Sequence, residues 1–150
     1  MLKNADHLAH RLNAEVLEKS VLPKMPEPVP TGPGVFLHGD PVPANVVSGL
    51  EGITFVDWQC PATGDVCEDL FIFASPAMQS LYGGAPLSDL QIQNLLSGYG
   101  NVETTARFHQ LAPLLHWRMA AYCLWMAERG ADDYRSVIQL ELDALERCQG

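Results

Sequence analysis

Three oxygen-bearing side chains occur in a fixed order near the first third of the chain. The segment VFLHGDPVPANVV interrupts two apolar runs with the triplet His38-Gly39-Asp40 and then with Asn45, five residues after the aspartate. Asp57 follows the next apolar run, in ITFVDW. Carboxylate and amide oxygens suit Mg²⁺, and two carboxylates held close together repel each other unless a cation or proton lies between them. The pattern therefore predicts a magnesium site.

A hairpin would bring these residues together. NVV and ITFVDW are β-rich, and the turn-like segment SGLEG separates them. A turn centred near Glu51 places Asn45 directly opposite Asp57, since both lie equally far from the turn. Directly opposed residues of an antiparallel pair point to the same face. We therefore expect Asn45 and Asp57 to converge where the loop carrying Asp40 arrives.

The same order of residues occurs in protein kinases. There a catalytic-loop Asp is followed five residues later by an Asn that holds Mg²⁺, and a later Asp holds Mg²⁺ as well. The combined stretch FLHGDPVPANVV…ITFVDWQCPATGDVCEDL resembles the aminoglycoside phosphotransferase and choline kinase-like family. This resemblance implies an α+β, mainly helical fold, the C-terminal lobe of a protein kinase-like fold with a small β-hairpin at the catalytic loop. Residues 1–150 would form this single domain, without the N-terminal ATP-binding lobe.

The resemblance also implies roles for the candidate residues. Asp40 is the catalytic residue, which accepts the proton of a substrate hydroxyl. Asn45 and Asp57 are the metal ligands and belong, with His38, to the cofactor-binding set, in which His38 chiefly braces the loop. The implied cofactors are Mg²⁺ and ATP or another nucleoside triphosphate. The implied acceptor is a hydroxyl of a small molecule, and a cationic one would suit the acidic chain.

Two features of the family pattern concern structure more than chemistry. Asp65 and Asp69 match the GDxxxDL segment that follows the metal-binding aspartate, and we expect them to be mainly structural. The family loop commonly reads HGDLHPGN, whereas this chain has HGDPVPAN. Pro41 lacks a backbone N–H and restricts Asp40 before it, and Val42 replaces the second histidine.

The elements that hold the phosphates of ATP in kinases are not found in this sequence. No Gly-rich strand–turn–strand occurs, and no strand Lys is present to pair with a helix Glu, because Lys3, Lys19 and Lys24 all lie in the expected first helix or in the proline-rich connector. We therefore expect a truncated or partial phosphotransferase with weak or no activity alone. The alternative is a non-catalytic binding protein derived from such a lobe, which would expose apolar surface and form a homodimer or bind a partner lobe. A metallophosphatase ranks last, because two metals need more His, Asp and Asn ligands.

The composition and charge of the chain argue against several other classes of protein. The 150 residues carry a formal net charge of −9, which disfavours nucleic acid as a partner. The apolar run LAPLLHWRMAAYCLWMA is interrupted by charged and proline residues and predicts a buried helix, not a membrane span. The four cysteines show no C-x-x-C spacing and are expected to be reduced, in a cytoplasmic protein.

Most of the chain carries helical periodicity. His109 and His116 lie on apolar helices, and we expect their rings to be packed or to reach solvent only at the tip. Tyr122 and Trp125 are expected in the core or in the wall of a substrate cleft. We expect helices over about residues 4–21, over 68–82 with a break at Pro76, after a capping box at Ser88 and Gln91, over 102–129 with a kink at Pro113, and at the C-terminal end with Ile138, Leu142 and Leu145 on one face.

Overall fold

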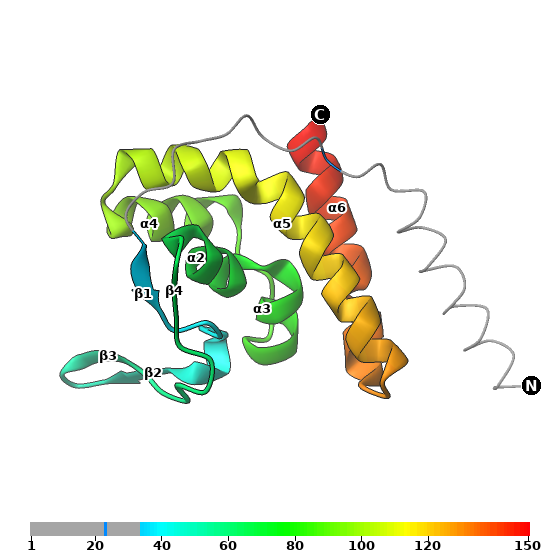
Figure 1. The fold of residues 1–150 in the computed structure, drawn as a ribbon, viewed down its shortest axis with the longest axis horizontal. Helices are drawn as coiled ribbons and strands as arrows, with labels where there is room; N and C mark the ends of the chain where they lie inside the picture. Colours follow the sequence, from blue (N-terminus) through cyan, green and yellow to red (C-terminus); the bar gives the residue numbers. More distant parts are fainter. Residues whose placement is uncertain (1–22, 24–33) are drawn as a thin grey trace, which may run out of the picture.

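The computed structural model of this protein describes Pro23 and residues 34–150. Two small antiparallel sheets come first along the chain, and helices follow them (Figure 1). This arrangement confirms an α+β, mainly helical fold. The helix expected over 4–21 and most of the proline-rich connector lie outside the described residues. The strands are β1 (Val35–Leu37), β2 (Val46–Gly49), β3 (Gly52–Phe55) and β4 (Ala62–Gly64), with a short 3-10 helix η1 (Pro43–Asn45) before β2.

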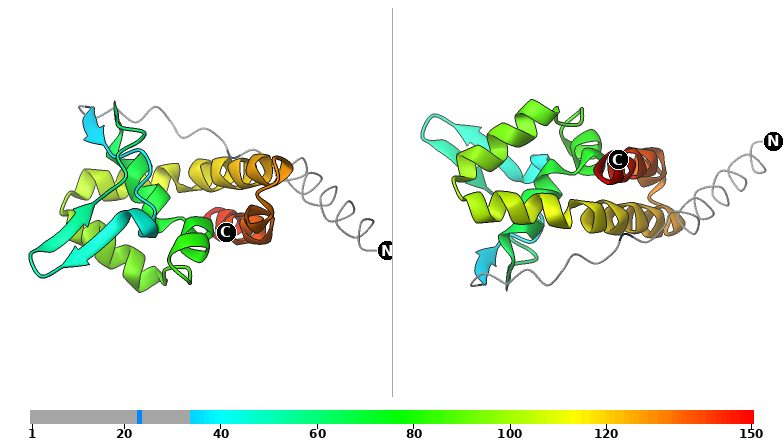
Figure 2. Two further views of the ribbon diagram at one scale, coloured as in Figure 1. Left: turned by 90° about the horizontal axis from the view of Figure 1, so that it is seen from below. Right: turned by 90° about the horizontal axis from the view of Figure 1, so that it is seen from above.

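The predicted hairpin is formed by β2 and β3, and it projects away from the helices (Figures 1 and 2). Val46 pairs with Phe55 and Gly49 pairs with Gly52, so only two residues form the loop. Gly52 has a φ of 122°, a backbone conformation that would be costly for a residue with a side chain. A two-residue loop of this kind fixes the register of the strands.

The predicted register was wrong by one residue. The turn is centred between Leu50 and Glu51, not on Glu51, so Asn45 lies opposite Val56. The backbone N–H of Val56 donates to the Asn45 carbonyl oxygen at 2.9 Å. In a regular strand this slip would send the Asp57 side chain to the opposite face. Asp57, however, has a φ of 63° and leaves the extended conformation, so strand alternation does not decide where its side chain points.

The second sheet pairs β1 with β4, which the sequence did not predict. Val35 lies opposite Gly64 and Leu37 opposite Ala62. This pairing places the strand just before the loop that carries Asp40 next to the strand just before the α-helix that begins at Val66. It brings Cys60 against Gly39, a contact on which the shape of the catalytic loop depends.

The helices begin and end close to the predicted positions. Ser75 caps the second of two short helices with its side chain, and Pro76 is the first residue of that helix. The capping box of Ser88 and Gln91 is present, as predicted. The helices are α2 (Val66–Ala74), α3 (Pro76–Tyr82), α4 (Asp89–Tyr99), α5 (Val102–Glu128) and α6 (Ile138–Gln149), with the 3-10 helix η2 (Asp132–Val137) before α6.

The core lies where α2 and α6 pack against the long helix α5 and where α3 packs against α2 and α6; α5 runs beside α6 (Figure 1). Phe71 on α2 and Cys123 on α5 are 1% and 0% exposed. The predicted face of the last helix is confirmed, since Ile138, Leu142 and Leu145 are all buried. The four cysteines are free, as expected. None of the helices in the described ranges is long and apolar enough to cross a membrane.

Candidate active site

The catalytic loop is held at its backbone by one carboxylate from α2. Asp69 accepts hydrogen bonds from the backbone N–H of His38 at 2.7 Å and from that of Gly39 at 3.0 Å, one on each oxygen. A carboxylate that receives two backbone N–H groups ties the two segments together strongly. Asp69 therefore fixes the loop relative to α2, which is the structural role expected for it.

His38 braces the loop from inside. Its side chain is buried, and its ring nitrogen Nδ1 accepts from the backbone N–H of Asp40 at 3.3 Å. The other ring nitrogen, Nε2, then carries the proton and donates to the carbonyl oxygen of Val56 at 2.8 Å. The ring also lies 4.4 Å from the ring of Trp58, centroid to centroid. His38 thus connects the loop before β2 to the segment after β3.

Gly39 is required by a close approach of two backbone segments. It has a φ of 83°, and a Cβ atom at this position would lie 2.0 Å from the carbonyl oxygen of Cys60. No side chain fits into that space. The glycine of the His-Gly-Asp triplet therefore allows the β4 connection to pass directly beneath the catalytic loop.

Asp40 and Asn45 are in direct contact across the loop. The amide nitrogen Nδ2 of Asn45 donates to the backbone carbonyl oxygen of Asp40 at 2.9 Å, with a longer contact of 3.4 Å to the carboxylate oxygen Oδ2. Because the amide nitrogen is engaged in this way, the amide oxygen Oδ1 is directed elsewhere and stays available as a ligand. Val42, in the place of the family's second histidine, is buried in the core below.

Asp57 lies near Asp40 and affects its charge. Burial raises the pKa of Asp40 above its ordinary value, and the negative charge of Asp57 raises it further. The pKa is lowered in turn by His38 and by the hydrogen bond from Asn45, but the net effect is a rise. One oxygen of Asp57, Oδ1, accepts from the Gln59 side-chain amide at 2.6 Å, and the other is left for a ligand.

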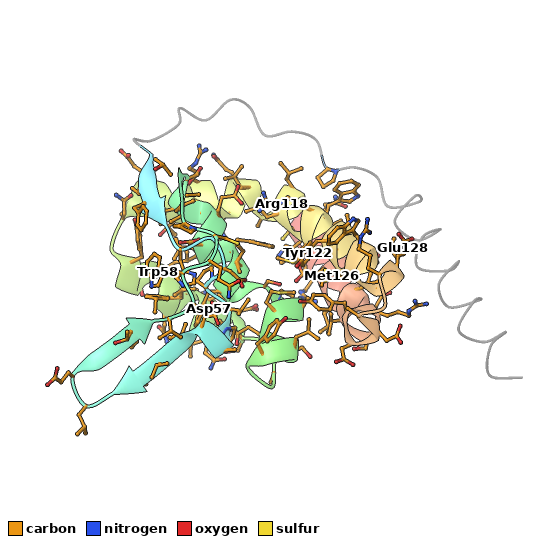
Figure 3. The ribbon with its side chains drawn as sticks, turned by 60° about the horizontal axis from the view of Figure 1, so that its bottom comes forward. Asp57, Trp58, Arg118, Tyr122, Met126 and Glu128 are labelled. Atoms are coloured by element: carbon orange, nitrogen blue, oxygen red, sulfur yellow. The ribbon has the colours of Figure 1, made fainter. Side chains whose placement is uncertain are left out.

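The left-handed backbone of Asp57 is the one positive φ among the described residues other than glycine. Such conformations cost free energy and persist where the surrounding structure holds them, often at functional sites. Figure 3 shows Asp57 and Trp58 where the hairpin joins the rest of the molecule. The Trp58 indole N–H donates to the Phe55 carbonyl oxygen at 2.9 Å and helps to hold this turn.

The donor set fits a magnesium ion. Mg²⁺ in phosphoryl-transfer sites commonly takes one or two carboxylates and completes its shell with water and substrate phosphates. Among the described residues, no hydrogen bond engages the amide oxygen of Asn45 or the second carboxylate oxygen of Asp57. Within the part of the chain that the structure describes, no three His, Cys, Asp or Glu side chains gather as a metal site. One amide oxygen and one carboxylate would leave most positions of such a shell to water and to substrate oxygens.

A cluster of aromatic side chains connects α3, α5 and η2. We use the name aromatic cluster for Tyr82 on α3, Tyr122 and Trp125 on α5, and Tyr134 in η2. The hydroxyl groups of Tyr82 and Tyr134 are 2.6 Å apart, and Tyr122 stacks on Trp125 with ring centroids 6.0 Å apart. Burial raises the pKa of Tyr122, and the negative charge of Asp40 raises it too, so the cluster is within electrostatic reach of Asp40.

The aromatic cluster is open to solvent. Tyr122 is 42% exposed and Trp125 is 46% exposed, so they line a surface and are not part of the core. Of the two roles expected from the sequence, core or cleft wall, the core role is wrong for both. Tyr122 and Met126 are seen on α5 in Figure 3, on the helix that continues toward Glu128.

Two ion pairs join α2 to α5 near the site. Asp65 caps α2 by accepting from the backbone N–H of Cys67 at 3.0 Å, and it forms an ion pair with Arg107. Burial alone would raise the pKa of Asp65, but the hydrogen bonds from Cys67 and Arg107 lower it overall. Arg118 forms a second pair with Glu68. Asp65 is thus structural, as expected, and the helix that carries Asp69 is fixed against α5.

Comparison with known proteins agrees with the pattern of this site. The model of the phosphotransferase enzyme family matches residues 2–114, which include the catalytic loop, both sheets and α2 to α4. The chain belongs to this family. The resemblance to aminoglycoside phosphotransferases and choline kinases is thereby confirmed at the level of the family. The match ends within α5, so residues 115–150 lie outside it. The searches of curated proteins and of solved structures returned no match to this chain.

The residues that the sequence singled out lie close together in the structure, and some of the residues that support them were not predicted. The structure brings His38, Asp40 and Asn45 together through hydrogen bonds and places Asp57 near them. It also assigns bracing roles to Trp58, which the sequence marked only as part of the Asp-Trp pair, and to Cys60, which the sequence did not single out. The Asp-Trp dipeptide was visible in the sequence as a signal for Trp58, whereas no local pattern marked Cys60.

Proposed function

We propose that this chain carries the catalytic and metal-binding residues of a magnesium- and nucleoside triphosphate-dependent phosphotransferase. The acceptor is a hydroxyl group of a small molecule. The described residues correspond to the C-terminal lobe of a kinase-like fold, acting in the cytoplasm as a partial form with weak or no activity alone. The membership of the phosphotransferase family supports the reaction class.

The contact between Asn45 and Asp40 carries this proposal. A side-chain amide that donates to the carbonyl oxygen of the catalytic residue, at 2.9 Å, fixes the spacing between a base and a metal ligand. Phosphoryl transfer depends on such positioning and on charge stabilisation more than on covalent chemistry by the protein. A chance pair of polar residues in a solvated loop would not need Gly39, His38 and Asp69 to hold it in place.

Each residue then has a defined task. Asp40 accepts a hydrogen bond from the acceptor hydroxyl, orients its oxygen toward the phosphoryl group and receives the proton. Asn45 and Asp57 would hold Mg²⁺, which when bound neutralises charge on the transferred phosphoryl group. His38 keeps Asp40 in position through the backbone N–H of that residue. The raised pKa of Asp40 makes it a better proton acceptor than an ordinary surface aspartate.

The aromatic cluster supports a location for the acceptor. Tyr122 lies within electrostatic reach of Asp40, and its ring and that of Trp125 are partly exposed. Aromatic faces attract cations, and the chain has a net charge of −9. We therefore propose a cationic small molecule with a free hydroxyl, bound against Tyr122.

Nucleotide affinity is expected to be low for this chain. Residues 34–150 contain no lysine, and no Gly-rich hairpin is found in the sequence. Kinases use both to hold the phosphates of ATP. Calorimetry with Mg-ATP should therefore give weak or undetectable binding, and micromolar affinity would contradict this part of the proposal.

The decisive experiment compares phosphoryl transfer by the wild type and by Asp40→Ala. Purified protein is incubated with Mg-ATP at millimolar concentration and a panel of amino alcohols, choline and aminoglycosides, and phosphorylated product is detected by mass spectrometry. Any transfer should disappear in Asp40→Ala, while circular dichroism shows an unchanged fold. Transfer that persists in this variant would place the catalysis elsewhere.

One observation favours a second candidate function, a non-catalytic binding protein that forms homodimers. Large apolar side chains of both sheets are exposed, among them Phe36 at 70%, Ile53 at 68% and Leu50 at 108%. Apolar surface of this kind often marks a protein–protein interface. Analytical ultracentrifugation of the wild type and of Ile53→Lys distinguishes the two candidates. A dimer that dissociates in the variant would favour the binding role, and a monomer in both would remove it.

A further inference from the structure

A buried carboxylate on α6 holds the N-terminal end of α3. Glu141 is 0% exposed, and so is Ser75, the residue that caps α3. The carboxylate oxygen Oε1 accepts from the Ser75 hydroxyl at 2.5 Å and from the backbone N–H of Ala77 at 3.0 Å. The first N–H groups of a helix lack partners within the helix, and a negative charge near them is favourable. Glu141 therefore fixes the place where α3 begins.

Glu141 is itself held by a histidine on α5. The ring nitrogen Nδ1 of His116 lies 2.6 Å from the second carboxylate oxygen, Oε2. The His116 ring also packs edge-on against the ring of Phe71 on α2. Both oxygens of Glu141 thus have partners, and a buried polar network in which each member is satisfied is rigid. The start of α3 is therefore tied to α5 and α6, which pack along each other.

The other end of α3 supports the short helix η1, which Pro43 begins and Asn45 ends. Gly83 ends α3, and a Cβ atom added there would lie 3.1 Å from Cγ of Pro43. The same Cβ atom would lie 2.7 Å from Oε1 of Gln79. The Gln79 side chain is buried, and its amide nitrogen donates to the Phe73 carbonyl oxygen at 2.6 Å. The C-terminal end of α3 is therefore a packed platform for η1.

One rigid element thus connects the buried carboxylate to the candidate site. The helix α3 contacts both α6 and η1, and it lies between them in Figure 1. Its seven residues span only about 10 Å, and close-packed interiors transmit a displacement instead of absorbing it. A shift at the Glu141 end should therefore reach Pro43 at the other end.

We infer that Glu141 is a positioning residue for Asn45: by anchoring α3, it sets the place of η1 and of the Asn45 amide beside Asp40. The consequence for metal binding rests on the function proposed for Asn45, whereas the effect on the position of the amide does not. Residues that orient a metal ligand without touching the metal commonly change metal affinity by about 10-fold to 100-fold when they are replaced.

The test follows the side-chain amide signals of Asn45 in ¹⁵N NMR spectra of the full 150-residue chain, without metal or nucleotide. Glu141→Ala leaves Ser75 and Ala77 without their acceptor and should shift the Asn45 signals, while the signals of Asn94 on α4 should stay in place. Glu141→Gln keeps an acceptor oxygen and should return the Asn45 signals close to their wild-type positions. A role in stability alone predicts unchanged Asn45 signals in folded Glu141→Ala, and this result would overturn the inference.

Gly83→Ala tests the opposite end of α3 without altering Glu141. The added methyl group must displace Pro43 or the buried side chain beside it, so the Asn45 signals should shift here too. Gly98→Ala on α4 is the matched control, because its Cβ would meet nothing within 4 Å, and it should leave the Asn45 signals in place. Equal effects of the two glycine variants on Asn45 would contradict a connection through α3.

Metal affinity separates this role from the proposed function. With ATP present, the Mn²⁺ concentration that broadens the Asn45 signals should rise about tenfold in Glu141→Ala and stay near the wild-type value in Glu141→Gln. If the wild type shows no such broadening, the proposed metal-binding function fails, and the shifts of the Asn45 signals still decide whether Glu141 positions Asn45. If Glu141→Ala does not fold, Ser75→Ala takes its place, and unchanged Asn45 signals in both Ser75→Ala and Gly83→Ala would overturn the inference.

Discussion

The side-chain amide of Asn45 lies 2.9 Å from the backbone carbonyl oxygen of Asp40 and donates a hydrogen bond to it. The two residues are five positions apart, and the 3-10 helix η1 turns the chain between them. In the proposed mechanism, this contact sets the distance between the residue that accepts a proton and a residue that would hold Mg²⁺. The candidate site can therefore be tested at each of its members separately.

Replacement of Asn45 should weaken magnesium-dependent transfer without unfolding the protein. In Asn45→Ala both a metal ligand and the brace on Asp40 are lost, and a fall in kcat/KM of about 10² to 10³ is expected. Steady-state kinetics with varied Mg²⁺ measure it. Asn94→Ala, at an exposed position of α4, is the matched control and should keep wild-type activity. Equal losses in the two variants would point to a general effect on folding.

The pKa of Asp40 should respond in opposite directions to its two neighbours. Asp57→Asn removes a negative charge that raises the Asp40 pKa, so the pKa should fall toward its ordinary value. Asn45→Ala removes a hydrogen bond that favours the carboxylate, so the pKa should rise further. Carbon-13 NMR titration of the Asp40 carboxyl group without metal measures both shifts. Shifts of the same sign would show that the groups are not arranged as described.

The acidic limit of activity follows from the same pKa. Asp40 must be ionised to accept a proton, so activity is lost as the pH falls through its pKa. Because this pKa is raised, the wild type should lose activity on acidification at a pH above 3.8, the ordinary pKa of aspartate. A pH profile of kcat/KM at Mg²⁺ concentrations well below saturation locates the pH at which activity is lost in protein that starts free of metal. A loss of activity only at or below the ordinary value would argue against Asp40 as the proton acceptor.

Gly39→Ala should damage the loop itself. A Cβ atom at this position would lie 2.0 Å from the Cys60 carbonyl oxygen, and the positive φ adds strain. We expect a loss of about 2 kcal/mol or more in the free energy of unfolding, together with loss of activity. Gly98→Ala is the control, because its Cβ would meet nothing within 4 Å, and a small gain is expected there. Urea denaturation compares the two.

Glu141 should be the most sensitive buried position. Glu141→Ala leaves the Ser75 hydroxyl, the Ala77 N–H and His116 without their acceptor, which should cost about 3–5 kcal/mol. Glu146→Ala, exposed on the same helix, should cost little.

The pair of His116 and Glu141 should also make stability depend on pH. The His116 pKa of about 9 exceeds its unfolded value of 6.5, so the stabilisation that the charged His116 contributes is fully present below pH 6.5 and declines as the pH rises through 9. Urea denaturation at pH 6 and pH 9.5 should show this decline in the wild type.

The contact between Asp40 and Asn45 could be anticipated because the two residues are close together along the chain. The interval between Asp40 and Asn45 is short, so the sequence alone constrained their distance. The hairpin register was harder, since a shift of the turn by half a residue changes every pair, and Leu50 and Glu51 carry no strong turn signal. The left-handed φ of Asp57 is imposed by the surrounding structure and leaves no mark in the local sequence.

The contacts that support the site link distant segments and escaped prediction. Gly39 meets Cys60 only because β1 pairs with β4, and these strands are three residues long, too short for a periodicity signal. His116 contacts Glu141 across 25 positions. One signal for it was present, since Glu141 interrupts the apolar stripe of α6 between Ile138 and Leu142, and a charge at a buried position requires a partner.

The most direct test of the magnesium site is paramagnetic broadening by Mn²⁺, which replaces Mg²⁺. In ¹⁵N NMR spectra with ATP present, the side-chain amide of Asn45 and the backbone amide of Asp57 should broaden at the lowest Mn²⁺ concentrations. The side-chain amides of Asn94 and Asn101, on and before other helices, should remain sharp at those concentrations. If the control amides broaden first, or if Asn45 and Asp57 stay sharp while other signals broaden, the two residues do not hold the metal.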